Sequence, residues 1–164
     1  MKKILIIGLP GAGKSTFAKK LSEITKIPLY HIDLIYHKED KTTVSRFEFN
    51  FRVSEILNEF SWIIDGHYLS TLEKRLAKCD TVFFFDLPTD ICLEGAKARV
   101  GKKRDDFPWI ETELDYKFLE WIKNFRQDQI PETKHLLNLY NKKINVITFK
   151  SRDEADEYLK MLKL

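Results

Sequence analysis

The sequence predicts an α/β fold in which a parallel β-sheet lies between two layers of helices. Short apolar runs typical of buried strands alternate along the chain with stretches of helical periodicity. The first apolar run, 3–8, is joined to the first helical stretch, 14–25, by a segment that matches the phosphate-loop pattern G-x-x-x-x-G-K-[ST]. Neither a repeat nor a linker interrupts the alternation, so we expect one domain over 1–164.

The remaining elements follow from the same periodicities. We expect four further strands, at 28–32, 62–66, 81–85 and 146–149. We expect further helices at 45–60, 71–78, 89–100, 111–129, from Pro131 to about 140, and from 151 onward. The polar segment 34–44 has no period and predicts a loop. The aromatic residues, Phe47 and Phe51 included, follow core spacing rather than that of a surface on which bases stack.

Two of these helices begin with recognisable capping signals. Ser45 and Glu48 have the spacing of a capping box, and Val44 and Phe49 flank it at the positions of a hydrophobic staple. A second capping box, at 151 and 154, opens the last helix, whose apolar positions predict a face packed on the sheet.

Charge and composition exclude several classes of protein. The net charge of +3, from 28 basic and 25 acidic residues, is too small to indicate direct nucleic-acid binding. No apolar run approaches the ~20 residues that cross a bilayer, and the run after Lys2-Lys3 is too short for a signal peptide. Cys79 and Cys92 lack a paired spacing. We therefore expect a reduced, cytoplasmic protein; the oligomeric state is not predicted.

The phosphate-loop match carries the functional prediction. Converging backbone N–H groups and a helix N-terminus bind a polyphosphate, and glycines let the chain approach it closely. Lys14 adds a point charge, and the Ser15 hydroxyl is a ligand for Mg²⁺. A glycine-rich turn that merely joined strand and helix would explain neither residue. The residues expected to bind ATP are Gly8, Leu9, Pro10, Gly11, Ala12, Gly13, Lys14, Ser15 and Thr16.

Two aspartates follow predicted strands and therefore face the same edge of the sheet. Ligands in open α/β sheets lie outside the carboxyl ends of the strands, where Asp33 and Asp65 are expected. Asp33 is a candidate to bind a substrate hydroxyl, and Asp65 to order water around Mg²⁺ or to act as a base. The alternative is that each aspartate only caps a turn.

A basic segment between two predicted helices is a candidate lid, at about 100–110. Arg99 and Arg104, with the later Arg126, are candidates to neutralise the charge of a transferring phosphoryl group while the lid excludes water. The alternative is a solvated loop without a role. The histidines match no standard zinc spacing: His31 is expected in a strand, and His67 on the substrate side or in a turn.

Together these features resemble the adenylate-kinase-like P-loop kinases. The likeness tightens to the DNA topology modulation proteins (FlaR-type) and extends from residue 3 to about 160. It is carried by the segments 62–68, 84–88 with Cys92-Leu93, 101–106 and 121–126. Nothing in these residues supplies a mechanism for acting on DNA supercoiling.

The resemblance implies a three-layer P-loop NTPase fold with sheet order 2-3-1-4-5, a short lid, and ATP rather than a guanine nucleotide. The chain departs from the family at three places. His67 stands where the family usually has Asn, and no arginine lies near Gly95, so that packing against adenine would pass to Arg99 or Arg152. Asp65-Gly66 is not followed by the Phe-Pro-Arg of adenylate kinases, which weakens AMP as the acceptor.

The sequence therefore predicts an ATP- and Mg²⁺-dependent phosphotransferase that acts on a small acceptor. Lys14, Arg104, Arg99 and Arg126 are its expected catalytic residues, and Asp33, Asp65, Gly66 and His67 its expected substrate contacts. Ser15 would bind Mg²⁺ directly, and Asp65 through water. The alternative is an ATP-binding regulatory protein with slow hydrolysis and no acceptor.

Overall fold

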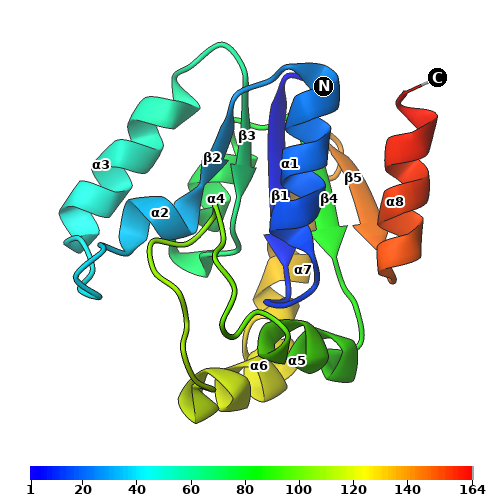
Figure 1. Ribbon diagram of the computed structural model, residues 1–164. Coiled ribbons are helices and arrows are strands. Elements are labelled where there is room, and N and C mark those ends of the chain that lie inside the picture. Colours follow the sequence, from blue (N-terminus) through cyan, green and yellow to red (C-terminus); the bar gives the residue numbers. More distant parts are fainter. Residues whose placement is uncertain (164) are drawn as a thin grey trace.

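A five-stranded parallel sheet organises the chain. The computed structural model describes residues 1–163 and orders the strands β2-β3-β1-β4-β5 (Figure 1), which confirms the predicted fold. The strands are β1 (Lys3–Gly8), β2 (Leu29–His31), β3 (Trp62–Asp65), β4 (Thr81–Phe85) and β5 (Asn145–Phe149). β1, β3 and β4 are apolar and almost wholly buried, as expected for central parallel strands.

Helices cover both faces of the sheet. α1 (Lys14–Thr25) contacts α8 (Arg152–Met161) on one face, and α4 (Leu69–Leu76) contacts α7 (Ile130–Tyr140) on the other (Figure 1). α2 (Ile32–Tyr36) and α3 (Arg46–Leu57) flank the β2 edge. α5 (Thr89–Lys97) and α6 (Tyr116–Asp128) lie beyond the carboxyl ends of the strands (Figure 1), where they can approach a ligand.

The predicted capping signals form as expected. The Ser45 hydroxyl accepts a hydrogen bond from the backbone N–H of Glu48 at 3.1 Å, and Val44 and Phe49 are both buried. The Glu48 carboxylate turns to Arg52 instead of back to the cap, so only half of the capping box is made. At the start of α8, the Ser151 hydroxyl accepts from the backbone N–H of Glu154.

The predicted loop at 34–44 is wrong in its first part, because α2 continues directly from β2. Ile32 is fully buried and the backbone N–H of His37 closes the turn on the Asp33 carbonyl at 2.9 Å. One buried residue in five gives too little periodicity to indicate a helix from sequence. This short helix fixes Asp33 at the edge of the sheet.

The predicted extents of α3 and α6 are also corrected. α3 ends at Leu57, which leaves Phe60 exposed, and Phe47 and Phe51 lie on its solvent face. α6 begins at Tyr116, because the Asp115 carboxylate accepts from the backbone N–H of Phe118 and caps the helix there. The segment from 98 to 115, which we call the lid, is therefore longer than the sequence indicates.

Two expectations about the chain as a whole can be compared with the described residues. Within residues 1–163, no helix combines the length and apolar character that crossing a membrane requires. The two cysteines are free, with Cys92 buried on α5.

Candidate functional site

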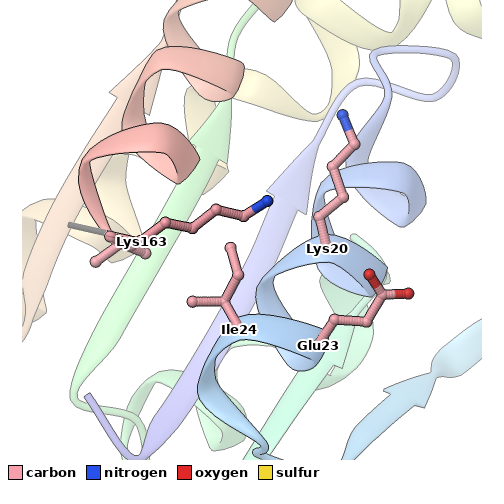
Figure 2. A pocket seen from close by; sticks show the side chains of 5 residues that line it. Lys20, Glu23, Ile24 and Lys163 are labelled. Atoms are coloured by element: carbon pink, nitrogen blue, oxygen red, sulfur yellow. The ribbon is translucent and has the colours of Figure 1, made fainter.

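A cavity of about 1060 Å³ opens at the carboxyl edge of the sheet and brings most of the predicted residues together. Its wall contains Gly8 and residues 10–16 of the phosphate loop, while Leu9 is fully buried outside the lining. The wall also contains the predicted residues Asp33, Asp65, Gly66, His67, Arg99 and Arg104. A second hollow lies away from this loop (Figure 2). It is lined by Lys20, Glu23 and Ile24 of α1 and by two residues that follow α8, and it contains no comparable set of chemical groups.

The phosphate loop is packed directly against α5. Gly11 has φ +77°, and a Cβ atom there would lie 2.0 Å from the Cys92 carbonyl oxygen. A Cβ atom at Gly95 would lie 2.1 Å from the Gly11 carbonyl oxygen. A side chain at residue 95 would therefore force the loop and α5 apart.

Arg152 contacts both the loop and α5. Its NH2 group donates to the Gly11 carbonyl at 2.9 Å and lies 3.5 Å from the Ile91 carbonyl oxygen, and it comes from the first residue of α8. Arg152 lines the cavity, and its contact with a nucleotide stays a prediction.

Lys14 and Ser15 open α1 inside the cavity. The Lys14 ammonium donates to the Leu9 carbonyl at 2.6 Å, so the side chain folds back over the loop. Burial lowers the pKa of Lys14, while the charge of Asp65 opposes that shift. The Ser15 hydroxyl donates to Asp65 Oδ2 at 2.6 Å, which joins the loop to the end of β3.

Asp65 is also paired with His31, a contact that the sequence did not predict. His31 Nδ1 lies 2.8 Å from Asp65 Oδ2, and the β2–β3 register places the two residues side by side. Burial by itself lowers the pKa of His31, but the hydrogen bond and charge of Asp65 outweigh it and leave the pKa raised. The imidazole therefore helps to hold the carboxylate in place.

The donor set at Ser15 and Asp65 suits Mg²⁺. One hydroxyl and one carboxylate oxygen meet beside the loop, and Mg²⁺ typically takes one or two protein oxygens, with water and substrate phosphates as its other ligands. Residues 1–163 contain no group of three His, Cys, Asp or Glu side chains arranged to hold a metal. The residues thus fit a Mg²⁺ ion whose other ligands are water and nucleotide phosphates, and they do not form a site made of protein ligands alone.

Asp33 faces the same cavity from α2. Tyr68 donates its hydroxyl to Asp33 Oδ1 at 2.6 Å, across from the start of α4. Burial raises the pKa of Asp33, although the Tyr68 hydrogen bond opposes the shift. Burial and the neighbouring Asp33 raise the pKa of Tyr68 far above its ordinary value, so the phenol keeps the proton that it donates.

Two lid arginines enter the cavity with unused donors. Arg99 Nε and Arg104 NH1 are buried and have no hydrogen-bond partner among residues 1–163. Burial and then the charge of Arg104 lower the pKa of Arg99, which shows that the two guanidinium groups are close. Asp106 and Glu111 lie 3.6 and 3.9 Å from Arg104, too far for strong hydrogen bonds. Such a pair of donors is suited to a bound anion.

The lid spans the cavity from α1 to α2. Asp105 pairs with Lys19 on α1 at 2.6 Å. At the other side, the rings of Phe107 and Trp109 pack against His37, at 5.2 and 5.6 Å between ring centroids. The lid therefore covers the space between the phosphate loop and Asp33.

The structure places Arg126 outside the cavity lining, contrary to its predicted catalytic position. Its NH1 donates to Asp86 Oδ1 at 2.7 Å and its NH2 to the Leu87 carbonyl at 2.6 Å. Lys150 and Lys134 also approach this carboxylate, at 2.5 and 3.5 Å. Burial alone raises the pKa of Asp86, but these cations outweigh it and keep the pKa lowered.

We therefore expect Arg126→Ala to affect stability rather than turnover. Asp86 is buried, but two lysines would remain near it, so the free energy of unfolding should fall by only about 1–2 kcal/mol. Urea denaturation measures this loss, and ADP release measures turnover. Lys123→Ala, which removes an exposed pair with Glu120, is the control and should change neither. A strong loss of turnover in Arg126→Ala, with wild-type turnover in Lys123→Ala, would show that Arg126 takes part in the reaction.

His67 lies beneath the phosphate loop, and both of its ring nitrogens are occupied by protein. Nδ1 accepts from the backbone N–H of Gly8 at 3.3 Å. Nε2 lies 3.2 Å from the hydroxyl of Thr133, which itself donates to the Gln129 carbonyl, so Nε2 carries the proton. The side chain is 7% exposed, so the ring supports the loop. His67 also lines the cavity, and its contact with a substrate stays a prediction.

The neutral state of His67 makes stability depend on pH. Burial, and then the charges of Lys14 and Arg75, lower its pKa from 6.5 to about 3. Unfolded chains take up this proton below pH 6.5 and folded chains do not. Stability is therefore lost as the pH falls from about 6.5 to about 3, by up to ~1.4 kcal/mol per pH unit.

We expect His67→Gln to flatten this dependence. The free energy of unfolding, measured by urea denaturation between pH 7 and pH 4, should fall less steeply in the variant than in the wild-type protein. His135→Gln, which changes an exposed histidine, should retain the wild-type slope. Equal slopes in His67→Gln and wild type would contradict the neutral buried ring.

Arg75 is a buried charged residue beside the site that the sequence did not predict. It is fully buried on α4 and donates to the carbonyl oxygens of Gly66, His67 and Tyr68. One signal was present: Arg75 lies four residues after Thr71 and between Leu72 and Leu76, on the buried stripe of a short helix.

Known proteins resemble this chain over most of its length. A family model described as chromatin associated protein KTI12 matches residues 1–59. A shikimate kinase of Clostridium botulinum is 33% identical over 135 residues, which cover 73% of this chain and 77% of that protein. An adenylate kinase of Pseudothermotoga lettingae is 29% identical over 67% of this chain, and the match spans about half (52%) of that longer protein.

Solved structures agree with these relatives in fold. The crystal structure of a shikimate kinase from Bacteroides thetaiotaomicron superposes with a TM-score of 0.63 at 14% identity, covering 98% of this chain and 95% of that one. These matches concern the broad kinase family, and the narrower resemblance to the topology modulation proteins stays a prediction. The phosphate loop, its site and the relatives together show that the chain belongs to the adenylate-kinase-like P-loop kinases, the family that includes the shikimate kinases.

Proposed function

We propose that the protein transfers the γ-phosphoryl group of ATP, with Mg²⁺, to a hydroxyl group of a small acceptor. One observation carries the proposal: a single cavity contains residues of the phosphate loop, the Ser15–Asp65 pair and the half-buried carboxylate of Asp33. A protein that only bound ATP would have no need of the last group.

Each residue has a role that its contacts support. The loop N–H groups and Lys14 hold the phosphates, and Arg152 lies where the nucleotide enters. Ser15 would hold Mg²⁺ directly and Asp65 through water, and the ion would neutralise negative charge on the nucleotide phosphates. Asp33 accepts a hydrogen bond from the acceptor hydroxyl and orients it, while Tyr68 fixes the direction of the carboxylate.

The lid arginines act on the transferring group. Arg99 and Arg104 bring buried, unused donors toward the cavity that also holds Lys14. Negative charge that spreads over the phosphoryl oxygens would find these donors already in place. The lid would also exclude water, because its tip packs on His37 beside Asp33.

Acceptor-dependent release of ADP tests the proposal. ATP turnover with Mg²⁺ would be measured alone and with shikimate, gluconate, AMP and a panel of nucleosides and sugars. We expect at least one hydroxyl compound to accelerate ADP release and to appear in its phosphorylated form. Asp33→Asn should abolish that acceleration and leave ATP binding unchanged. Tight ATP binding with slow hydrolysis, and no acceleration by any acceptor, would favour a regulatory ATP-binding protein instead.

A further inference from the structure

A charged side chain without a carboxylate partner lies in the core beside the site. Arg75 has 0% exposure, and no acidic side chain within residues 1–163 pairs with it. Its Nε donates to the Thr71 hydroxyl at 3.1 Å, and its NH1 to the Gly66 carbonyl at 2.7 Å. Its NH2 donates to the carbonyl oxygens of His67 and Tyr68. One guanidinium group thus donates hydrogen bonds to three successive carbonyl groups and to the Thr71 hydroxyl of the helix that follows them.

Burying this arginine costs free energy that packing the helix alone does not require. Burying an unpaired guanidinium carries a desolvation penalty that hydrogen bonds to neutral carbonyls offset only in part. Burial lowers the pKa of Arg75 to about 9, and the group still carries its charge at neutral pH. Leu72 and Leu76, its neighbours on the buried stripe of α4, show that this face accepts apolar side chains.

The three peptide groups belong to the loop 66–68, which supports the phosphate loop. His67 Nδ1 accepts from the backbone N–H of Gly8, the first residue of the phosphate loop. That hydrogen bond requires the neutral ring with its proton on Nε2. Arg75 holds the His67 backbone through its carbonyl, and its charge lies near enough to disfavour a second proton on the ring.

The same loop also supports the acceptor side of the cavity. Tyr68 adopts φ 32° and ψ 79°, an unusual backbone conformation for a residue with a large side chain. In this conformation its hydroxyl reaches Asp33 Oδ1 at 2.6 Å, and its carbonyl receives Arg75 NH2 at 2.9 Å. The guanidinium therefore stabilises the strained residue that orients Asp33.

We propose that Arg75 is a positioning residue that sets the phosphate loop and the acceptor carboxylate relative to one another through the loop 66–68. Its role in catalysis rests on the proposed phosphotransfer. Its effect on the geometry of the loop does not, and can be measured without turnover. Because a displacement of about 1 Å in a reacting group can cost ~10²-fold in rate, a small relaxation of this loop should be visible in kcat.

The test uses Arg75→Lys, which keeps a charge but cannot reach three carbonyl groups at once, and Thr71→Val. The second change removes the acceptor of Arg75 Nε together with the longer hydrogen bond, 3.3 Å, from the Thr71 hydroxyl to the Tyr68 carbonyl. Lys74→Met, an exposed change on the same helix, is the control. The readouts are the ¹⁵N shifts of the His67 ring and the amide shift of Gly8 by NMR, and the kcat and KM for ATP at temperatures well below the unfolding midpoint of each variant.

We expect Arg75→Lys to mix the His67 tautomers, to move the Gly8 amide signal, and to lower kcat by ~10²-fold with little change in KM. Thr71→Val should show the same pattern to a smaller extent, and so keeps the test decisive if Arg75→Lys does not fold. A lower unfolding midpoint with unchanged ring shifts and kcat would overturn the proposal, because it would show a purely stabilising arginine. If the wild type transfers no phosphoryl group, the NMR shifts still decide the positioning role, while the proposed function fails separately.

Discussion

Replacing Arg104 by alanine should lower kcat for phosphoryl transfer by ~10³-fold, since arginines that neutralise the transferring group contribute rate factors of this size. The Arg104 side chain is 13% exposed, and its NH1 is buried without a hydrogen-bond partner among residues 1–163. Its other neighbours are the Phe107 ring, 4.9 Å from the guanidinium carbon, and two acidic groups beyond strong hydrogen-bond range. Arg104 NH1 is thus available to donate a hydrogen bond to a bound phosphoryl group.

Steady-state ADP release, with the accelerating acceptor once it is identified, measures this loss. The KM for ATP should change much less than kcat, because the loop and Lys14 supply most of the ground-state contacts. Lys103→Ala removes the same charge from the adjacent lid residue, which is exposed, and is the matched control. Equal rates for Arg104→Ala and wild type would leave the lid without a chemical role.

Replacing Lys14 by alanine should weaken ATP binding and lower kcat/KM for ATP by ~10²–10³-fold. Lys14 is the one residue of the loop that brings a full positive charge to the phosphates, and burial lowers its pKa in the free protein. A bound polyphosphate would restore the ordinary preference for the charged form. ATP binding should therefore be accompanied by proton uptake at Lys14, which calorimetry in buffers of different ionisation enthalpy measures.

The matched comparison for Lys14 is Lys74→Ala, an exposed lysine on α4 that should bind ATP like the wild type. Undiminished ATP affinity in Lys14→Ala would contradict the assignment of the phosphate loop itself.

The elements that the sequence predicts well are those whose signals are local. The phosphate loop is defined by consecutive residues between a strand and a helix, and the caps at Ser45 and Ser151 by pairs three residues apart. Asp33 and Asp65 were predicted at one edge because parallel strands end together, and both line the cavity.

The contacts that the sequence does not predict join distant parts of the chain. Arg126 was grouped with the lid by its charge, but the end of β4 presents Asp86 to it forty residues earlier in the chain. His67 follows Gly66 at the predicted edge, yet its ring turns inward, because Gly8 and Thr133 offer it two complementary hydrogen bonds. No local sequence pattern predicts the partners of Arg126 or of His67.

The contact between Gly11 and Gly95 has a consequence for how the two substrates are sensed. The second half of α5 touches the phosphate loop at Cys92, Gly95 and Ala96, and Arg99 follows Gly95 by four residues. The lid therefore begins within about one turn of the contact with the loop. A shift of the loop on binding phosphate would act on this end of α5, and so on the segment from which Arg99 and Arg104 extend.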